Sequence, residues 1–358
     1  MTSNHDIHII GARPNFMKAG PVVLALGAMG RRPILVHTGQ HYDHAMSEVF
    51  FEQLGLPQPD LNLGVGSGSH AQQTAALVLA LEATFLEHRP DRVVVYGDVN
   101  STLAAALVAS KLDIEIGHVE AGLRSFDRTM PEEVNRVVTD VLSRLHFVTS
   151  PEGVDQLAAE GIPREGIHLV GNPMIDTLLR FRGQLDTVGA RSRHGLPDTY
   201  AVATIHRPSN VDDLAVAKGL VSGLSHVAAR LPILIPLHPR GREVLTEAGL
   251  MEVLGIHVVE PLGYLDFMAL MAGATLVLTD SGGIQEETTV LGIPCLTLRE
   301  NTERPITLTM GTNVLVGSDP DRIANAADAA LSDPPLGRIP PLWDGEAGAR
   351  IATILSHQ

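Results

Sequence analysis

The chain has 358 residues, a formal net charge of −15 and 44% hydrophobic residues. This length predicts two domains, each large enough to bury its own core. The acidic balance argues against a nucleic-acid partner, which would need a basic face, and no apolar run reaches the roughly 18–20 residues that a membrane span requires.

The N-terminal residues MTSNHDIHIIG lack a basic region followed by a long apolar stretch, so we expect no signal peptide. The single cysteine, Cys295, lies in the apolar run IPCLTL and cannot form an intrachain disulfide. We expect it to be a buried small residue in a reducing compartment. These features predict a cytoplasmic protein.

The first half of the chain alternates short apolar runs with longer amphipathic stretches. Such alternation predicts right-handed βαβ units around a parallel sheet. The expected strands are residues 7–10, 33–37, 92–96, 115–118 and 145–149, and the expected helices include residues 18–28, 67–88 and 101–112.

The second half repeats this rhythm, with strands expected at residues 200–205, 233–237, 257–259, 275–278, 294–298 and 313–316. We therefore predict an α/β protein of two Rossmann-like, doubly wound domains, residues 1–172 and 173–343. Residues 166–182 and the polar run 183–197 are the expected passage between them. The segment 344–358 has helical spacing and is expected to return to the first domain.

Ligands of open parallel sheets bind beyond the carboxyl ends of the strands. The most informative strand end is LVLTDSGGIQEE, residues 276–287, which predicts a strand, a tight turn and a helix start. Gly282 and Gly283 would let backbone N–H groups approach an anion, and the helix dipole favours negative charge there. A plain turn with Ser281 as helix N-cap fits the same residues. Glu286 and Glu287, one turn later, suit ribose hydroxyls, so the stretch indicates a nucleotide site.

The first expected strand ends in GARPNFMK, which is not a GxGxxG dinucleotide motif. Arg13 can clasp a phosphate with two donors, and Lys18 follows about one helical turn later. The alternative is two solvated basic residues at a helix start.

Two further strand ends each carry one candidate residue. Asp98 follows the strand 92–96, where helix capping and catalysis are equally consistent with its position. His206 follows the strand 200–205 and could donate a proton or contact phosphate, although a lone histidine is more often structural.

Separate carboxylates follow the strand 115–118 in the stretches VEAGLR and MPEEVNR. Glu120 and Glu132, each with an arginine a few residues later, fit general acid and base roles. Surface ion pairing is the alternative. We favour that alternative for Glu133, because its neighbour Glu132 directly follows a proline.

Several motifs occur together and in a fixed order: YGDVNST, GHVEAGLR, MPEEVNR, GNPMID, IHRPSN, EPLGYLDFM, LTDSGGIQEE and NTERP. In order and rough spacing they resemble the non-hydrolysing UDP-N-acetylglucosamine 2-epimerases over nearly the whole chain. The resemblance implies two Rossmann-like domains in the glycosyltransferase-B arrangement, with the active site in the cleft.

The resemblance also implies roles for individual residues. The expected catalytic residues are Asp98, Glu120, Glu132 and His206. The expected substrate-binding residues are Arg13, Lys18 and Arg136, with Ser281, Gly282 and Gly283 on the phosphates, Glu287 on the ribose and Phe267 toward the uracil. Asn15, Ser209 and Ile306 depart from the glutamates found in many members, and these positions bear on substrate choice.

The implied reaction interconverts UDP-GlcNAc and UDP-ManNAc by elimination of UDP to 2-acetamidoglucal and re-addition. It requires no nicotinamide cofactor and no metal, and family members are commonly homodimers. Three alternatives stay open: a hydrolysing epimerase that releases ManNAc and UDP, a glycosyltransferase of the same fold, and a sensor that binds nucleotide sugars without turnover.

Overall fold

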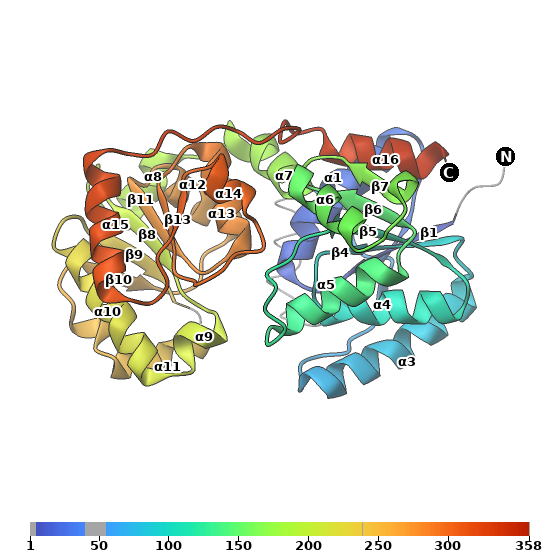
Figure 1. Cartoon of the computed structure of the whole chain (residues 1–358), viewed down its shortest axis with the longest axis horizontal. Coiled ribbons are helices and arrows are strands. Elements are labelled where there is room, and N and C mark those ends of the chain that lie inside the picture. The colour runs from blue at the N-terminus through green and yellow to red at the C-terminus, as the bar shows by residue number, and fades with distance from the viewer. Residues whose placement is uncertain (1–4, 40–54, 238, 358) are drawn as a thin grey trace. The chain divides into compact units, whose positions relative to one another are not determined.

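The computed structural model describes residues 5–39, 55–237 and 239–357. The chain forms two compact units, Met1–Arg180 with Pro341–Gln358, and Phe181–Pro340 (Figure 1). Each unit contains one parallel sheet flanked by helices. The predicted fold class, an α/β protein of two Rossmann-like domains, is confirmed.

The first unit contains a seven-stranded parallel sheet with the order β3-β2-β1-β4-β5-β6-β7. Its strands are β1 (Asp6–Ile10), β2 (Ile34–His37), β3 (Leu61–Asn62), β4 (Arg92–Tyr96), β5 (Glu115–Ala121), β6 (Leu145–Val148) and β7 (Ile167–Leu169). Every residue of β1 and β4 is buried, as expected for central strands of a sheet that is covered on both faces.

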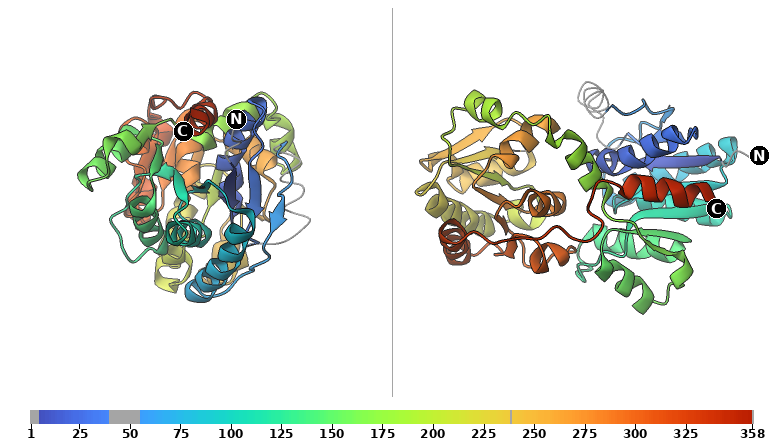
Figure 2. Two further views of the ribbon diagram at one scale, coloured as in Figure 1. Left: turned by 90° about the vertical axis from the view of Figure 1, so that its right-hand side faces the viewer. Right: turned by 90° about the horizontal axis from the view of Figure 1, so that it is seen from above.

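The helices of this unit are α1 (Arg13–Ala28), α3 (His70–His88), α4 (Asn100–Lys111), α5 (Pro131–Leu142), α6 (Pro151–Ala159), α7 (Pro173–Arg182) and α16 (Ala347–His357). Apolar residues of α3 and α4 pack on β1 and β4 in one core cluster. The C-terminal helix α16 lies against α1 (Figure 2). The approach is close, since a Cβ on Gly348 would lie 2.6 Å from the Pro21 carbonyl carbon.

The second unit contains a six-stranded parallel sheet with the order β10-β9-β8-β11-β12-β13. The strands are β8 (Ala201–Thr204), β9 (Ile233–Pro236), β10 (Ile256–Val259), β11 (Leu276–Thr279), β12 (Cys295–Thr297) and β13 (Asn313–Leu315). The helices are α8 (Thr187–Arg193), α9 (Pro208–Val211), α10 (Leu214–Ala228), α11 (Pro239–Glu247), α12 (Tyr264–Ala272), α13 (Gly282–Leu291), α14 (Ile306–Thr309) and α15 (Pro320–Ser332).

Alternate residues of β8 face two different apolar clusters. Ala201 and Ala203 pack with residues of α10 and α15, whereas Val202 packs with residues of α8 and α12. Helices therefore cover both faces of the sheet. Cys295 is 1% exposed, which confirms its prediction as a buried residue.

Strand order locates the ligand-binding edge of each sheet. In the first unit the chain builds β2 and β3 on one side of β1 and then places β4 on the other; β8 and β11 repeat this reversal in the second unit. The loops that leave the two central strands therefore diverge, which opens a crevice at their carboxyl ends.

Some elements differ from the predicted ones. Strands β3 and β7 have two and three residues and were not predicted, because such short runs give no measurable alternation. The expected boundary follows residue 172, whereas the first unit extends to Arg180. Strand β5 continues beyond the predicted end at residue 118, and this extension carries Glu120. Within the described part of the chain, no helix is both long and apolar enough to cross a bilayer.

Candidate functional site

In the first unit, side chains from two elements meet beside Gly97, at the end of β4. Lys18 comes from α1 and Glu120 from β5, and the Lys18 ammonium contacts the Glu120 carboxylate. A Cβ on Gly97 would lie 2.9 Å from Lys18 Nζ and 3.2 Å from Glu120 Oε2, and its φ of +65° favours glycine. The absence of a side chain at Gly97 therefore makes room for this ion pair.

Glu120 has a backbone conformation that is unusual for a strand. Its φ is +73°, and the pairing of β5 with β6 shifts register between Val119 and Ala121. Such a bulge re-aims a side chain that regular alternation would place elsewhere. A left-handed non-glycine residue costs roughly 1–3 kcal/mol and persists only where its surroundings hold it. Glu120 is also 6% exposed, so a strained and buried carboxylate stands at the strand end.

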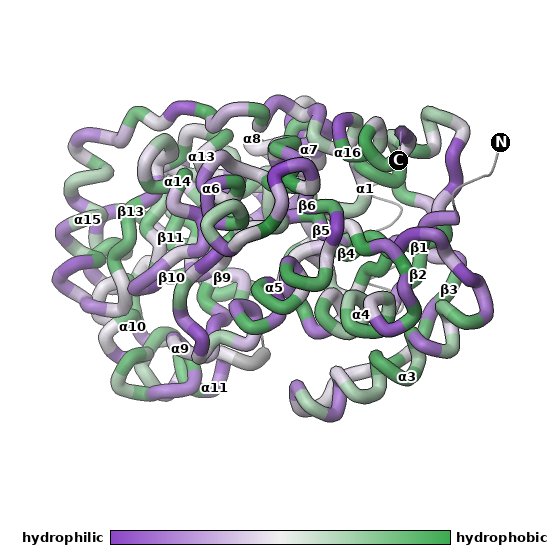
Figure 3. The backbone as a smooth tube through the Cα atoms, turned by 45° about the vertical axis from the view of Figure 1, so that its right-hand side comes forward, coloured by the Kyte–Doolittle hydropathy of each residue, from purple (hydrophilic) through white to green (hydrophobic). Residues whose placement is uncertain are grey.

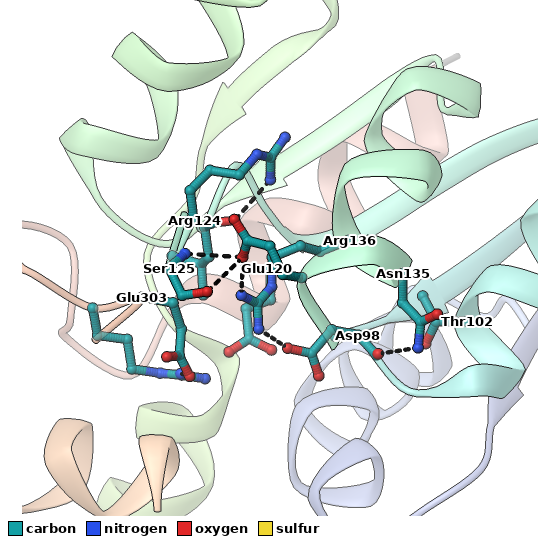
Figure 4. A network of polar contacts seen from close by, with 12 residues as sticks. Asp98, Thr102, Glu120, Arg124, Ser125, Asn135, Arg136 and Glu303 are labelled. Carbon is teal, nitrogen blue, oxygen red and sulfur yellow. Dashed lines mark hydrogen bonds and ion pairs between the residues drawn. The ribbon is translucent and has the colours of Figure 1, made fainter. Parts of the chain in front are cut away.

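Asp98 follows Gly97 and makes an ion pair with Arg136 of α5 (Figure 4). Asn135 donates a hydrogen bond to the Asp98 carbonyl over 2.8 Å. The Asp98 side chain is 26% exposed, whereas that of Arg136 is 2% exposed. Asp98 thus presents a partly open carboxylate whose orientation is set by a buried arginine.

The favoured interpretation of Glu133 as a surface ion pair is wrong. Glu133 is 2% exposed and lies 2.5 Å from Arg136. It also accepts hydrogen bonds from the backbone N–H groups of Ser125 and Phe126, both at 2.9 Å. Its role is to tie the loop after β5 to α5. Its neighbour Glu132 is half-buried in the first turn of α5.

The hydrogen bonds of Asn15 account for an asparagine at a position where many members of the resembling family have a glutamate. Its side-chain oxygen accepts a hydrogen bond from the N–H of Ala12 at 2.9 Å, and its amide donates to the Tyr96 carbonyl at 2.6 Å. A carboxylate could not donate this second bond. Asn15 therefore joins the turn after β1 to the end of β4. The backbone of Arg13 begins α1, but its side chain lies outside the described residues.

In the second unit, α13 begins directly after the β11 turn. Ser281 occupies the N-cap position, yet its side chain makes no capping hydrogen bond. Its own N–H donates to Thr279 Oγ1 at 3.0 Å. The plain N-cap interpretation therefore accounts for the position of Ser281 but not for its hydroxyl. The uncapped N–H groups and the dipole of the helix favour an anion.

Gly282 leaves room for an arginine at this helix start. A Cβ on Gly282 would lie 2.7 Å from Arg304 Cζ and 2.9 Å from Glu303 Oε1. Arg304 makes ion pairs with both Glu303 and Glu286. A buried guanidinium that is paired with two carboxylates therefore lies at the start of α13.

Glu287 lies fully inside this unit, one turn into α13. Burial, with a smaller contribution from Glu286, raises the pKa of Glu287 to about 8. The Tyr264 hydroxyl donates to Glu287 Oε1 at 3.4 Å. A carboxyl group in this state can accept or donate hydrogen bonds toward a ligand hydroxyl.

His206 at the end of β8 is held by Asp280, which sequence reasoning did not assign. His206 Nδ1 lies 2.7 Å from Asp280 Oδ1, and the N–H groups of His206 and Arg207 donate to Oδ2 at 2.9 and 2.8 Å. Burial alone would raise the pKa of Asp280, but His206 and these hydrogen bonds lower it. The His206 side chain is 50% exposed, so a carboxylate-oriented imidazole faces solvent. The pair forms because β8 and β11 are neighbours in the sheet, which the sequence alone does not indicate.

The other predicted positions are less involved. Phe267 is half-buried on α12 and packs against a core cluster. Two further positions differ from the glutamates of many family members. Ser209 is exposed, whereas Ile306 is buried in the core, with 3% of its surface exposed. A glutamate at Ile306 would bury a charge.

The structure therefore brings the predicted residues together in two groups. Lys18, Asp98, Glu120 and Arg136 lie around the ends of β4 and β5, where paired carboxylates can move protons. The second group lies around the ends of β8 and β11 and consists of His206, Ser281, Gly282, Gly283 and Glu287. The backbone N–H groups and the dipole at the start of α13 can hold an anion there.

Comparison with known proteins agrees with this arrangement. The family model described as UDP-N-acetylglucosamine 2-epimerase matches residues 28–356. A UDP-N-acetylglucosamine 2-epimerase of Methanococcus maripaludis is 42% identical over 97% of both chains. A UDP-2,3-diacetamido-2,3-dideoxy-D-glucuronate 2-epimerase of Pseudomonas aeruginosa is also 42% identical, over 97% of this chain and 98% of the relative.

A solved structure is similar over the same extent. The UDP-GlcNAc 2-epimerase of Methanocaldococcus jannaschii, crystallised with UDP-GlcNAc and UDP, matches with a TM-score of 0.92 and 40% identity, covering 99% of this chain and 100% of that one. Since the family model and these full-length likenesses agree, the chain belongs to the UDP-N-acetylglucosamine 2-epimerase family.

Proposed function

We propose that this protein is a non-hydrolysing UDP-N-acetylglucosamine 2-epimerase, an isomerase that interconverts UDP-GlcNAc and UDP-ManNAc. The observation that carries the proposal is the strained, buried Glu120, which is paired with Lys18 and adjoins Gly97, the residue before Asp98. The chain is 42% identical to an epimerase of this name. A protein that only binds nucleotide sugars has no need for a strained acid at this position.

The hydrogen at C2 of an N-acetylhexosamine has no adjacent carbonyl to acidify it. Departure of UDP first gives C1 oxocarbenium character, after which the C2 proton can be removed. The elimination yields 2-acetamidoglucal and UDP. A proton is then added to C2 from the opposite face while UDP returns to C1. Two faces of one carbon require at least two acid or base groups, for which we propose Asp98, Glu120 and Glu132.

The leaving group must stay bound during this sequence. We propose that Ser281, Gly282 and Gly283 hold the diphosphate, that Glu287 binds the ribose and that Phe267 faces the uracil. Arg13, Lys18 and Arg136 would bind the diphosphate and sugar, and His206, oriented by Asp280, would serve the departing phosphate. Preorganised donors at a developing anion stabilise the transition state.

Turnover of UDP-GlcNAc in deuterated water tests the reaction. We expect UDP-ManNAc to form with deuterium at C2, as measured by proton and phosphorus NMR without any acceptor. A glycosyltransferase would give no such label. Accumulation of UDP in step with loss of substrate would instead show the hydrolysing reaction and contradict our proposal.

The 42% identity to the glucuronate 2-epimerase favours a second candidate substrate. UDP-2,3-diacetamido-2,3-dideoxyglucuronate differs from UDP-GlcNAc at C3 and C6, whereas the C2 chemistry is the same. Parallel measurement of kcat/KM with both substrates decides between them. A higher kcat/KM for the glucuronate would change the assigned substrate but not the reaction class.

We also propose a cytoplasmic homodimer. Helix α5 exposes Val134, Val138 and Val141, which are 44%, 36% and 65% exposed and share one face at helical spacing. Polar and apolar residues alternate along this helix (Figure 3), and its polar side is buried. An exposed apolar stripe of this kind suits a second copy. Light scattering should give a molar mass of twice the chain mass. The Val141→Asp variant should give a molar mass closer to that of a single chain.

A further inference from the structure

Two fully buried side chains in the first unit have no part in the reaction described above. His118 lies on β5, two residues before Glu120, and Asp140 lies on α5. Both side chains are 0% exposed. Burial of an ionic pair is costly unless its remaining hydrogen-bonding groups are satisfied, so the partners of these two residues indicate what the pair does.

Asp140 holds the backbone on both sides of Glu120. Its Oδ1 lies 2.6 Å from His118 Nδ1, while its Oδ2 accepts a hydrogen bond from the N–H of Gly122 at 3.1 Å. His118 and Gly122 precede and follow Glu120 by two residues. One carboxylate therefore spans the bulge that places Glu120 in its left-handed conformation.

His118 extends the same contact to the second catalytic position. Its Nε2 lies 2.8 Å from the carbonyl oxygen of Gly97, the residue that adjoins Lys18 and Glu120 and precedes Asp98. A carbonyl oxygen only accepts hydrogen bonds, so Nε2 carries a hydrogen. Nδ1 faces a carboxylate and also carries one. The ring therefore makes a hydrogen bond through each of its nitrogens and joins β5 to the end of β4.

Arg124 completes the charge balance around Asp140. Its Nη1 lies 2.7 Å from Asp140 Oδ2, and its Nη2 lies 2.6 Å from Glu160. Burial alone would raise the pKa of Asp140, but His118 and Arg124 hold it below its usual value. Asp140 is accordingly a carboxylate held by His118 and Arg124, with hydrogen bonds on both of its oxygens.

We propose that Asp140 and His118 are positioning residues for the epimerase reaction, which fix the Glu120 carboxylate and the Gly97–Asp98 turn in their working geometry. This inference rests on the proposed function. Its physical basis is that the Glu120 backbone is strained and relaxes unless several contacts hold it. A displacement of about 1 Å at a catalytic group can cost roughly 10²-fold in rate.

Asp140→Asn tests the proposal. An asparagine can offer an oxygen to His118 or to Gly122 and Arg124, but its NH2 group then opposes a donor. We expect kcat with UDP-GlcNAc to fall by about 10²-fold. The dissociation constant of UDP should stay within about threefold by calorimetry, because Asp140 contacts none of the residues proposed above to bind UDP. Retention of kcat within about threefold in folded protein would overturn the proposal.

Glu160→Gln is the matched control. It removes one carboxylate from the same arginine but leaves Asp140 unchanged, and the Glu160 side chain is 28% exposed. We expect kcat to stay within about threefold of wild type, since Asp140 keeps all its contacts. An equal fall in both variants would show a general effect of lost charge and count against a positioning role.

Nitrogen-15 NMR of His118 provides a readout that does not depend on activity. We expect two protonated ring nitrogens near neutral pH in wild type and one unprotonated nitrogen in Asp140→Asn, with assignment by the signal missing from His118→Asn. An unprotonated nitrogen in wild type would overturn the proposal even if Asp140→Asn failed to fold. If wild-type protein shows two protonated nitrogens on His118 but no epimerase activity, the proposed function is wrong. The hydrogen bonds of His118 and Asp140 would still be as described.

Discussion

The two strand-end groups are built on the same topology but differ in how their charges are held. In the first unit Glu120 and Arg136 are nearly inaccessible and already paired with Lys18 and Asp98. In the second unit the helix start at Ser281 is uncapped by its own side chain, and the His206 side chain is half exposed.

This difference separates groups that would move protons from groups that would hold a ligand. A proton-transfer group must keep one orientation throughout the reaction, so strain and buried ion pairs are tolerated around it. A binding surface must instead leave its donors open until the anion arrives. The comparison therefore predicts that substitutions at Glu120 and Gly97 lower kcat and that those at the start of α13 weaken UDP binding.

Glu120→Gln should have the largest effect. It preserves shape but removes the carboxylate, so we expect turnover to fall by roughly 10²–10⁴-fold, with UDP affinity unchanged by calorimetry. Glu115→Gln is a control on the same strand, where Glu115 lies 2.6 Å from Arg92. More than about a tenth of wild-type activity in Glu120→Gln would exclude a proton-transfer role.

Alanine at the two close-packed glycines should sharpen the comparison. In Gly97→Ala, the new Cβ meets Lys18 and Glu120 at a φ of +65°, so we expect kcat to fall by about 10²-fold. In Gly282→Ala, the Cβ displaces the flexible end of Arg304, and we expect UDP to bind about tenfold more weakly, or roughly 1.4 kcal/mol. Steady-state kinetics and calorimetry on both variants check this, and the reverse pattern would contradict it.

The central features of the fold were predictable because their signals are local. Runs such as RVVVY, which form fully buried strands, alternate with amphipathic helices, and that rhythm is sufficient to predict a parallel sheet. The residues at the strand ends then followed from the rule that ligands bind at the carboxyl edge. The short strands β3 and β7 lacked such a signal, since they are recognised only by the neighbours with which they pair.

The supporting residues were less predictable, for a physical reason. Asp140 and Asp280 act through partners that are 22 and about 70 residues away, and a sequence without its fold gives no indication of those distances. The prediction of a surface ion pair at Glu133 was wrong because the burial of this residue depends on how the loop at Ser125 folds back on α5. The Asp176 side chain in GNPMID is similar: it accepts the Gly348 N–H at 2.7 Å at the start of α16.

Glu287→Gln should change stability in a pH-dependent way. Because burial raises the pKa of Glu287 from 4.5 to about 8, the folded state keeps a proton that the unfolded state loses, and stability falls as pH rises through this range. Glutamine resembles the protonated form and escapes that loss. We expect the variant to be more stable than wild type by of order 2 kcal/mol near pH 8, and by much less near pH 5.

Thermal unfolding of both proteins at the two pH values measures this effect. Glu286→Gln is the matched control, since Glu286 is equally buried but lies 3.0 Å from Arg304 Nε. It should lower stability at both pH values, because it leaves a buried arginine with one fewer carboxylate. A Glu287 variant with the same melting shift at both pH values would show that the carboxyl group titrates normally.

Ser281→Ala should have the smallest effect on stability. Its hydroxyl makes no capping bond, so we expect a change below about 0.5 kcal/mol, together with several-fold weaker UDP binding. Ser69→Ala is the counterpart in the first unit, because Ser69 Oγ does accept the Gln72 N–H at the start of α3. That variant should lose about 1 kcal/mol without affecting UDP. Melting curves and UDP titrations on both variants distinguish a serine that caps a helix from one whose hydroxyl is open to a ligand. Equal UDP affinity in Ser281→Ala and wild type would show that the hydroxyl is not part of the proposed phosphate site.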